Sequence, residues 1–123
     1  MKKIKFIADK VTYETNFEEG YHMVGFSDNG DNPNQYIILQ RFMKFDAQDI
    51  KLGMNSYYFE YLDQSNSGYG VCSNIVAEKG KILFIIKEQA LNNIEQIEVI
   101  FDENVIEDLE AFKIIFSEII LKN

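Results

Sequence analysis

Residues Tyr57–Asn74 read YYFEYLDQSNSGYGVCSN and have the pattern of a β-hairpin. Alternate residues of the first arm fall on opposite faces of a strand, Tyr57, Phe59 and Tyr61 on one face and Tyr58, Glu60 and Leu62 on the other. The polar run Asp63–Gly68 consists of residues that favour sharp reversals. The second arm opens with Tyr69-Gly70-Val71-Cys72 and is predicted to continue to Ala77.

The same period of two extends along the chain on both sides of this hairpin. Strands are predicted in residues 2–15, as one or two strands, and at Tyr21–Ser27, Gln35–Phe42, Lys81–Lys87 and Gln96–Phe101. Between them, the segment Met43–Asn55 lacks alternation and predicts a loop with one helical turn at Ala47–Ile50. Because strands do not alternate with long helical segments, the sheet is expected to be mostly antiparallel.

The C-terminal segment has helical rather than strand periodicity. Apolar residues recur at spacings of three and four, at Val105, Leu109, Phe112, Phe116 and Ile119. Asn104 is the predicted N-cap, with Glu107 reaching back to its amide. The whole pattern predicts a single α+β domain over residues 1–123: a mostly β fold with an antiparallel sheet of about six to seven strands and one C-terminal amphipathic helix packed on it.

Composition excludes several classes of partner. The chain has 123 residues and a formal net charge of −8, so it lacks the Lys and Arg surplus that nucleic acids or anionic membranes require. That charge suits solubility, or attraction to a basic protein. The start, MKKIKFIADK, is too short and polar in its apolar part for a signal peptide, and no apolar run is long enough to span a bilayer. A cytoplasmic protein is expected.

The residues that commonly carry catalysis lack the neighbours that catalysis needs. His22 has no orienting partner in sequence, and nothing near Cys72 would stabilise a thiolate. The run Asp28–Asn34 differs from a calcium loop, whose twelfth position would be Leu39 instead of Glu. Asp46 and Asp49 could pair for acid–base chemistry, but no apolar shield surrounds them. We therefore predict no catalytic residue, no metal site and no cofactor.

Arg41 and Glu60 are each the one charged residue inside an apolar or aromatic strand. A charge in such a place is costly unless it is paired. If the two strands are neighbours, a structural ion pair between Arg41 and Glu60 would satisfy both side chains. The alternatives are that both charges lie at a sheet edge, or that they contact a partner.

From Tyr21 onward the chain resembles the Immunity protein 10 family of bacterial polymorphic toxin systems. The matching blocks are Met23–Phe26, Ile38–Arg41, Gln48–Ile50 with Leu52–Met54, Tyr57-Tyr58 with Glu60, Asp63-Gln64, Ser67–Gly70, and the closing segment from Ile97 through the helix to Phe116. The most specific are the LQR, LGM and YYxE…DQ…GYG blocks. One departure is Val71, where a second Gly is expected after Tyr69-Gly70.

The resemblance implies a non-catalytic protein, encoded beside a toxin, that binds the toxin domain and blocks it in the producing cell. On exposure and charge alone, the residues expected to contact the toxin are Asp28, Asp31, Asp46, Asp49, Asp63 and Gln64. An unpaired sheet edge would also leave homodimerisation open.

The alternative is a small ligand-binding or hydrolytic β-domain. In that hypothesis Tyr57, Tyr58, Tyr61 and Tyr69 would converge on Glu60 to form a pocket that also holds His22.

Overall fold

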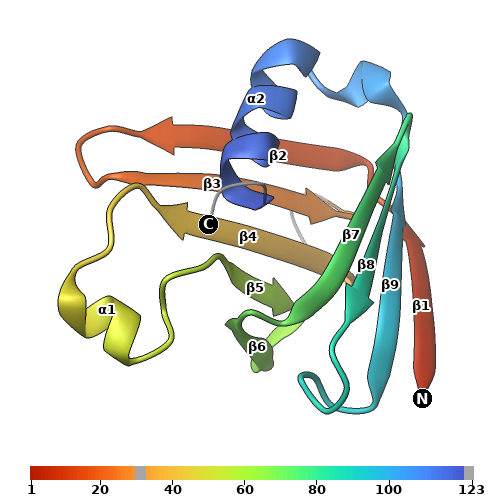
Figure 1. Ribbon diagram of the computed structural model, residues 1–123. Helices are drawn as coiled ribbons and strands as arrows, with labels where there is room; N and C mark the ends of the chain where they lie inside the picture. Colours follow the sequence, from red (N-terminus) through yellow and green to blue (C-terminus); the bar gives the residue numbers. More distant parts are fainter. Residues whose placement is uncertain (30–32, 121–123) are drawn as a thin grey trace.

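The computed structural model describes residues 1–29 and 33–120, which form a mostly β protein with a C-terminal helix (Figure 1). The described strands are β1 (Lys2–Ile7), β2 (Lys10–Asn16), β3 (Tyr21–Ser27), β4 (Tyr36–Phe42), β5 (Tyr58–Tyr61), β6 (Asp63–Tyr69), β7 (Cys72–Glu78), β8 (Lys81–Ile86) and β9 (Ile94–Ile100). The helices are α1 (Ala47–Lys51), the short 3₁₀ helix η1 (Glu103–Val105) and α2 (Leu109–Ile120). The predicted fold class and the helical turn at α1 are confirmed.

The strands form two sheets instead of the single sheet expected. Five consecutive strands make an antiparallel sheet in the order β2-β3-β4-β5-β6, and a four-stranded sheet has the order β1-β9-β8-β7, in which β1 and β9 are parallel. The chain passes between the sheets at Ala8 and Asp9. The amide of Ala8 donates to Ile100 and that of Asp9 donates to Ser27, so successive residues bond to different sheets.

The stretch Tyr57–Asn74 forms a different hairpin from the one predicted. The reversal between β5 and β6 lies at Leu62, which has a φ of 66°, and a bulge between Glu60 and Tyr61 precedes it. The polar run Asp63–Gly68 is mostly strand β6 and not a turn. The expected second arm leaves this sheet after Gly70, and β7 joins the other sheet. Polar residues are tolerated in β6 because it is an edge strand with one face and one edge open to solvent.

The core lies where the inner face of the five-stranded sheet meets α2 and the four-stranded sheet. Phe26 is its centre, 1% exposed, with its ring centroid 6.4 Å from that of Phe84, 5.9 Å from Phe101 and 6.0 Å from Phe112. These four rings come from β3, β8, the end of β9 and α2. The contacts of Phe26 with Phe84 and Phe112 are edge-to-face and that with Phe101 is tilted, and aromatic contacts of this kind add to the stabilisation that burial alone provides.

Helix α2 packs across β2, β3 and β4 on the inner face, as its wide apolar stripe predicts (Figure 1). Its buried residues are Phe112, Phe116 and Ile119. The cap is Asp108, whose side chain accepts a hydrogen bond from the amide of Ala111 at 3.1 Å. The predicted cap at Asn104 is wrong, because Asn104 lies within η1 and the chain is extended at Ile106 before α2 begins.

Candidate functional site

The outer face of the five-stranded sheet, opposite α2, carries a cluster of tyrosines around one glutamate. Strand register builds it: Tyr58 on β5 lies opposite Tyr69 on β6, and Glu60 lies opposite Ser67. On the other side of β5, Glu60 lies opposite Ile38 of β4, two residues from Tyr36. Because residues two apart on a strand share a face, all these side chains lie on the same side of the sheet. We name Tyr36, Tyr58, Glu60 and Tyr69 the tyrosine face.

Glu60 holds two of these rings in place. The hydroxyl of Tyr36 donates to Glu60 Oε2 at 2.6 Å, and the hydroxyl of Tyr58 donates to Oε1 at 2.6 Å. The ring of Tyr69 lies against that of Tyr58, with 5.7 Å between centroids. Glu60 is only 9% exposed although it lies on the outer face, since the surrounding side chains cover it. The cluster is therefore an ordered surface whose rings need little further ordering to bind a partner.

Two phenols of the cluster, those of Tyr36 and Tyr58, are held as neutral hydrogen-bond donors. Partial burial raises the pKa of Tyr36 to about 12, and the hydrogen bond to the Glu60 carboxylate adds to this. The same two causes, in the same order, raise the pKa of Tyr58. A phenol with a raised pKa is a poor general base at neutral pH, so the cluster suits recognition better than proton transfer.

A shallow hollow of about 160 Å³ lies beside Tyr36 on this face, lined by Thr12, Gly25, Ser27 and Ile38 among others. A Cβ at Gly25 would approach Thr12 Oγ1 to 2.7 Å, so a larger residue at this position would require the Thr12 side chain to shift. The register of β2 with β3 is unbroken at Gly25. The hollow could receive a protruding side chain of a binding partner.

The ion pair predicted between Arg41 and Glu60 is not formed, because the two side chains lie on opposite faces of the sheet. Arg41 is opposite His22 and points inward, whereas Glu60 is opposite Ile38 and points outward. Arg41 Nη1 instead donates to the carbonyl of Ile119 at 3.1 Å, and its guanidinium lies 5.3 Å from the ring centroid of Phe45. Burial lowers the pKa of Arg41.

The residues of the expected Tyr/Glu pocket are likewise divided between the inner and outer faces of the sheet. His22 is on the inner side, where Nδ1 lies 2.9 Å from Thr15 Oγ1, and it lines a hollow of about 420 Å³ with Arg41 and the exposed Phe17. Tyr57 and Tyr61 also belong to the inner face, and Tyr61 is buried. Of the four tyrosines expected in this pocket, only Tyr58 and Tyr69 lie on the same face as Glu60, so the pocket expected to hold His22 and Glu60 together does not form.

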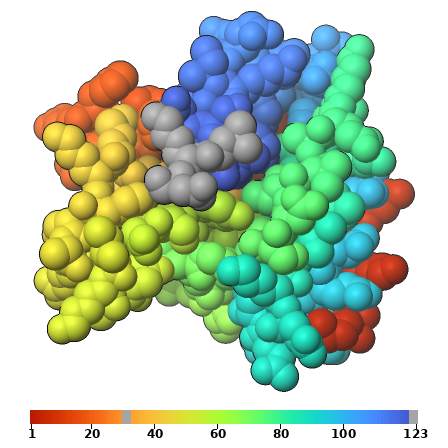
Figure 2. All heavy atoms as spheres, viewed as in Figure 1, coloured from red at the N-terminus to blue at the C-terminus, as the bar shows by residue number. Residues whose placement is uncertain are grey.

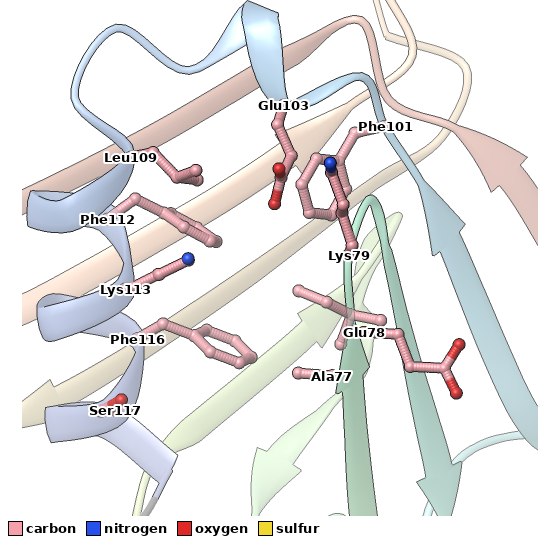
Figure 3. A pocket seen from close by; sticks show the side chains of 11 residues that line it. Ala77, Glu78, Lys79, Phe101, Glu103, Leu109, Phe112, Lys113, Phe116 and Ser117 are labelled. Atoms are coloured by element: carbon pink, nitrogen blue, oxygen red, sulfur yellow. The ribbon is translucent and has the colours of Figure 1, made fainter.

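A hollow of about 580 Å³ lies between α2 and the β7–β8 hairpin (Figure 3). Its walls are mainly the rings of Phe101, Phe112 and Phe116, with Lys79 and Lys113 at the rim. In the space-filling view, α2 and this hairpin border one another on one side of the molecule (Figure 2). Among the described residues there is no group of three or more His, Cys, Asp or Glu that could hold a metal ion.

The acidic residues predicted to contact a toxin do not form one cluster. Asp46 and Asp49 make a reciprocal capping box at α1, each side chain accepting from the other's amide at 2.8 and 3.0 Å. Asp28 accepts from the amides of Asn34 and Gln35, at the other end of β4. Asp63 begins β6, and the amide of Ser65 lowers its pKa. Gln64 is exposed, and Asp31 lies outside the described residues.

Tyr36 is the member of the tyrosine face that the sequence did not reveal, since it precedes Glu60 by 24 residues. Its alternation with Ile38 and Gln40 placed it on one face of its strand, but the alternation does not say which strand is next to it. The register of β4 with β5 supplies that information.

The fold and the tyrosine face define a small β-rich protein with an ordered aromatic surface. A family model described as Immunity protein 10 matches residues 7–116, nearly the whole chain, and the chain belongs to that family. The resemblance seen in the sequence is thus confirmed. No curated protein and no solved structure gives a significant match. None of the described helices is long and apolar enough to cross a membrane.

Proposed function

We propose that this protein is a non-enzymatic immunity protein of a bacterial polymorphic toxin system, acting in the cytoplasm of the producing cell. It binds a cognate toxin domain and blocks it by steric and electrostatic occlusion. The observation that carries this proposal is the family match over residues 7–116. A family of immunity proteins implies a protein toxin as the partner.

Two features of the molecule support binding as the mode of action. Tyrosines are enriched where proteins recognise one another, because a rigid ring offers a large contact area and a hydroxyl at small entropic cost. The net charge of −8 would speed the capture of a basic toxin. The charged residues expected from the sequence to contact the toxin, Asp28, Asp46, Asp49 and Asp63, would add to this attraction, and the exposed Gln64 could accept or donate a hydrogen bond.

Co-expression with the toxin domain encoded beside this chain tests the proposal. Cells that produce the toxin alone should stop growing, and cells that also produce this protein should survive. A catalytically inactive toxin domain should elute with this protein as one complex on a sizing column. An unrelated acidic protein of similar size, expressed to the same level, is the control for charge alone. Unchanged killing together with the absence of a complex would reject the function.

The same sizing column reports on homodimerisation. β6 and β7 are edge strands, each with one described neighbour in its sheet. Elution of the protein alone at twice its 14.3 kDa mass would show that two copies associate.

A further inference from the structure

We propose that the tyrosine face is the toxin-contacting surface and that it receives an arginine or lysine side chain of the toxin. This inference rests on the function proposed above and adds the surface and the chemistry of the contact. It differs from the expectation based on charge alone, in which exposed aspartates in loops make the contacts. The argument uses the coverage of the sheet, the partners of Glu60 and the distribution of lysines.

The first step is that α2 covers only one face of the five-stranded sheet. The helix packs on the inner side of β2, β3 and β4, and the tyrosine face lies on the other side. Tyr36, Tyr58 and Tyr69 are each partly exposed there. A sheet face that bears partly exposed aromatic rings is a favourable place for a partner to bury apolar surface.

The second step concerns Glu60. Among the described residues its carboxylate has no cationic partner, and its two oxygens accept only the hydroxyls of Tyr36 and Tyr58. Two oxygens of a carboxylate can accept about four hydrogen bonds, so acceptor capacity is left over. A partly buried carboxylate gains from a neighbouring cation more than an exposed one does. An incoming guanidinium or ammonium group could meet this charge while lying over the Tyr58 and Tyr69 rings.

The third step is that the protein's own cations are gathered elsewhere. Five of its 12 Lys and Arg residues lie in the four-stranded sheet or between its strands, at Lys2, Lys3, Lys5, Lys79 and Lys81, and Lys87 follows β8, where its Nζ lies beside Gly70. On the outer face of the five-stranded sheet, Lys10 is the one described lysine, at the start of β2. After burial and Glu60, the charge of Asp63 makes a smaller contribution to the raised pKa of Tyr36, and Glu14 accepts a hydrogen bond from Tyr21 on the same face. Charge complementarity therefore selects a basic partner for this face.

The test measures how tightly this protein and its variants bind the catalytically inactive toxin domain encoded beside this chain. Glu60→Gln removes the charge and keeps the size, and Tyr69→Ala removes a partly exposed ring. Each should weaken binding about tenfold or more, as central interface residues do. Glu98→Gln, on the outer face of the other sheet, and Phe17→Ala, 83% exposed and outside the tyrosine face, are the matched controls. Both controls should bind within about threefold of the unaltered protein.

A second measurement identifies the toxin's cation. The surface Arg and Lys residues of the toxin are replaced one at a time by Ala and tested against the unaltered protein and against Glu60→Gln. One of these replacements should weaken binding to the unaltered protein and have little further effect with Glu60→Gln, because the coupled pair is already broken. Binding through this pair should also weaken with added salt, and less steeply for Glu60→Gln.

The outcomes separate this inference from the function. If the unaltered protein forms no complex, the function and the contact surface both fail. If the complex forms, but Glu60→Gln and Tyr69→Ala bind normally while Phe17→Ala, Lys79→Ala or Lys113→Ala does not, the function stands and the tyrosine face is rejected. Thermal melting of each variant checks folding. Tyr69→Ala decides the question if Glu60→Gln does not fold.

Discussion

The two faces of the five-stranded sheet are made by the same strands and use aromatic residues in opposite ways. On the inner face, Phe26 and Phe59 are fully buried and contact other rings edge-on, without any polar atom to satisfy. On the outer face, Tyr36 and Tyr58 direct their hydroxyls to one carboxylate, that of Glu60. The inner rings stabilise the fold by burial, whereas the outer rings form an ordered surface that remains available to a partner.

The same contrast holds for the two charged residues within these strands. Arg41, on the inner face, is satisfied by a backbone carbonyl of α2 and lies over the Phe45 ring. Glu60, on the outer face, is satisfied by phenols from its own sheet. Arg41 therefore ties the sheet to α2, and its contacts are internal. Glu60 keeps its charge within reach of a binding partner.

The largest expected effect is on the inner face. Phe26→Ala should lower the free energy of unfolding by about 3–5 kcal/mol, because it removes a ring that joins both sheets and α2 and leaves a cavity. Tyr69→Ala, on the outer face, should cost less than about 1.5 kcal/mol, because its ring already meets solvent on one side. Urea unfolding followed by circular dichroism measures both. Equal losses would mean that the two faces do not differ in the way described.

A smaller effect is expected at the link between Arg41 and α2. Arg41→Met keeps most of the apolar stem but removes the donor to the Ile119 carbonyl, and it should cost about 1–3 kcal/mol. Lys113→Met, on the exposed side of α2, is the matched control and should change stability by less than about 0.5 kcal/mol. If both substitutions have the same effect, the hydrogen bond to Ile119 does not hold the helix to the sheet.

Which residues face inward and which face outward could largely be predicted from the alternation of side chains along each strand. The pattern in Gln35–Phe42 assigned Ile37 and Leu39 to one face and Tyr36 and Ile38 to the other, and burial follows that division. The helical spacing of Phe112, Phe116 and Ile119 likewise identified the buried side of α2. These predictions succeed because they depend on side-chain direction, which is a local property of the backbone.

What the sequence could not provide is the pairing between strands. Whether Arg41 meets Glu60 depends on which residue of β4 lies opposite each residue of β5, and a shift of one position places a side chain on the other face. The prediction of a turn at Asp63–Gly68 was wrong for a different reason. Residues such as Asp63, Ser65 and Gly68 favour turns by themselves, and only the neighbouring β5 makes them a strand.

A further expected effect concerns alkaline pH and again compares the two faces. Burial raises the pKa of the Cys72 thiol, beside the inward-facing Tyr57, from its ordinary 9.0 to about 12. On the outer face the pKa of Tyr36 is raised from 10.0 to about 12. Below about pH 8 both groups are protonated in the folded and the unfolded chain, so neither group makes stability depend on pH there. As pH rises from about 9 toward 12, the unfolded chain loses these protons first and stability falls.

Urea unfolding at several pH values should show this decline in the free energy of unfolding. Two variants then show how much of the decline comes from a group on each face. Cys72→Ala should remove the part that begins near pH 9, and Tyr36→Phe should remove a part that begins near pH 10, because each deletes one group that titrates late in the folded protein. Ser73→Ala, next to Cys72 and exposed, is the control and should keep the full decline. A decline that both variants leave unchanged would mean that neither group is held protonated by its surroundings. A decline that only Tyr36→Phe reduces would place the protonated group on the outer face, beside Glu60, where the toxin's cation is expected to bind.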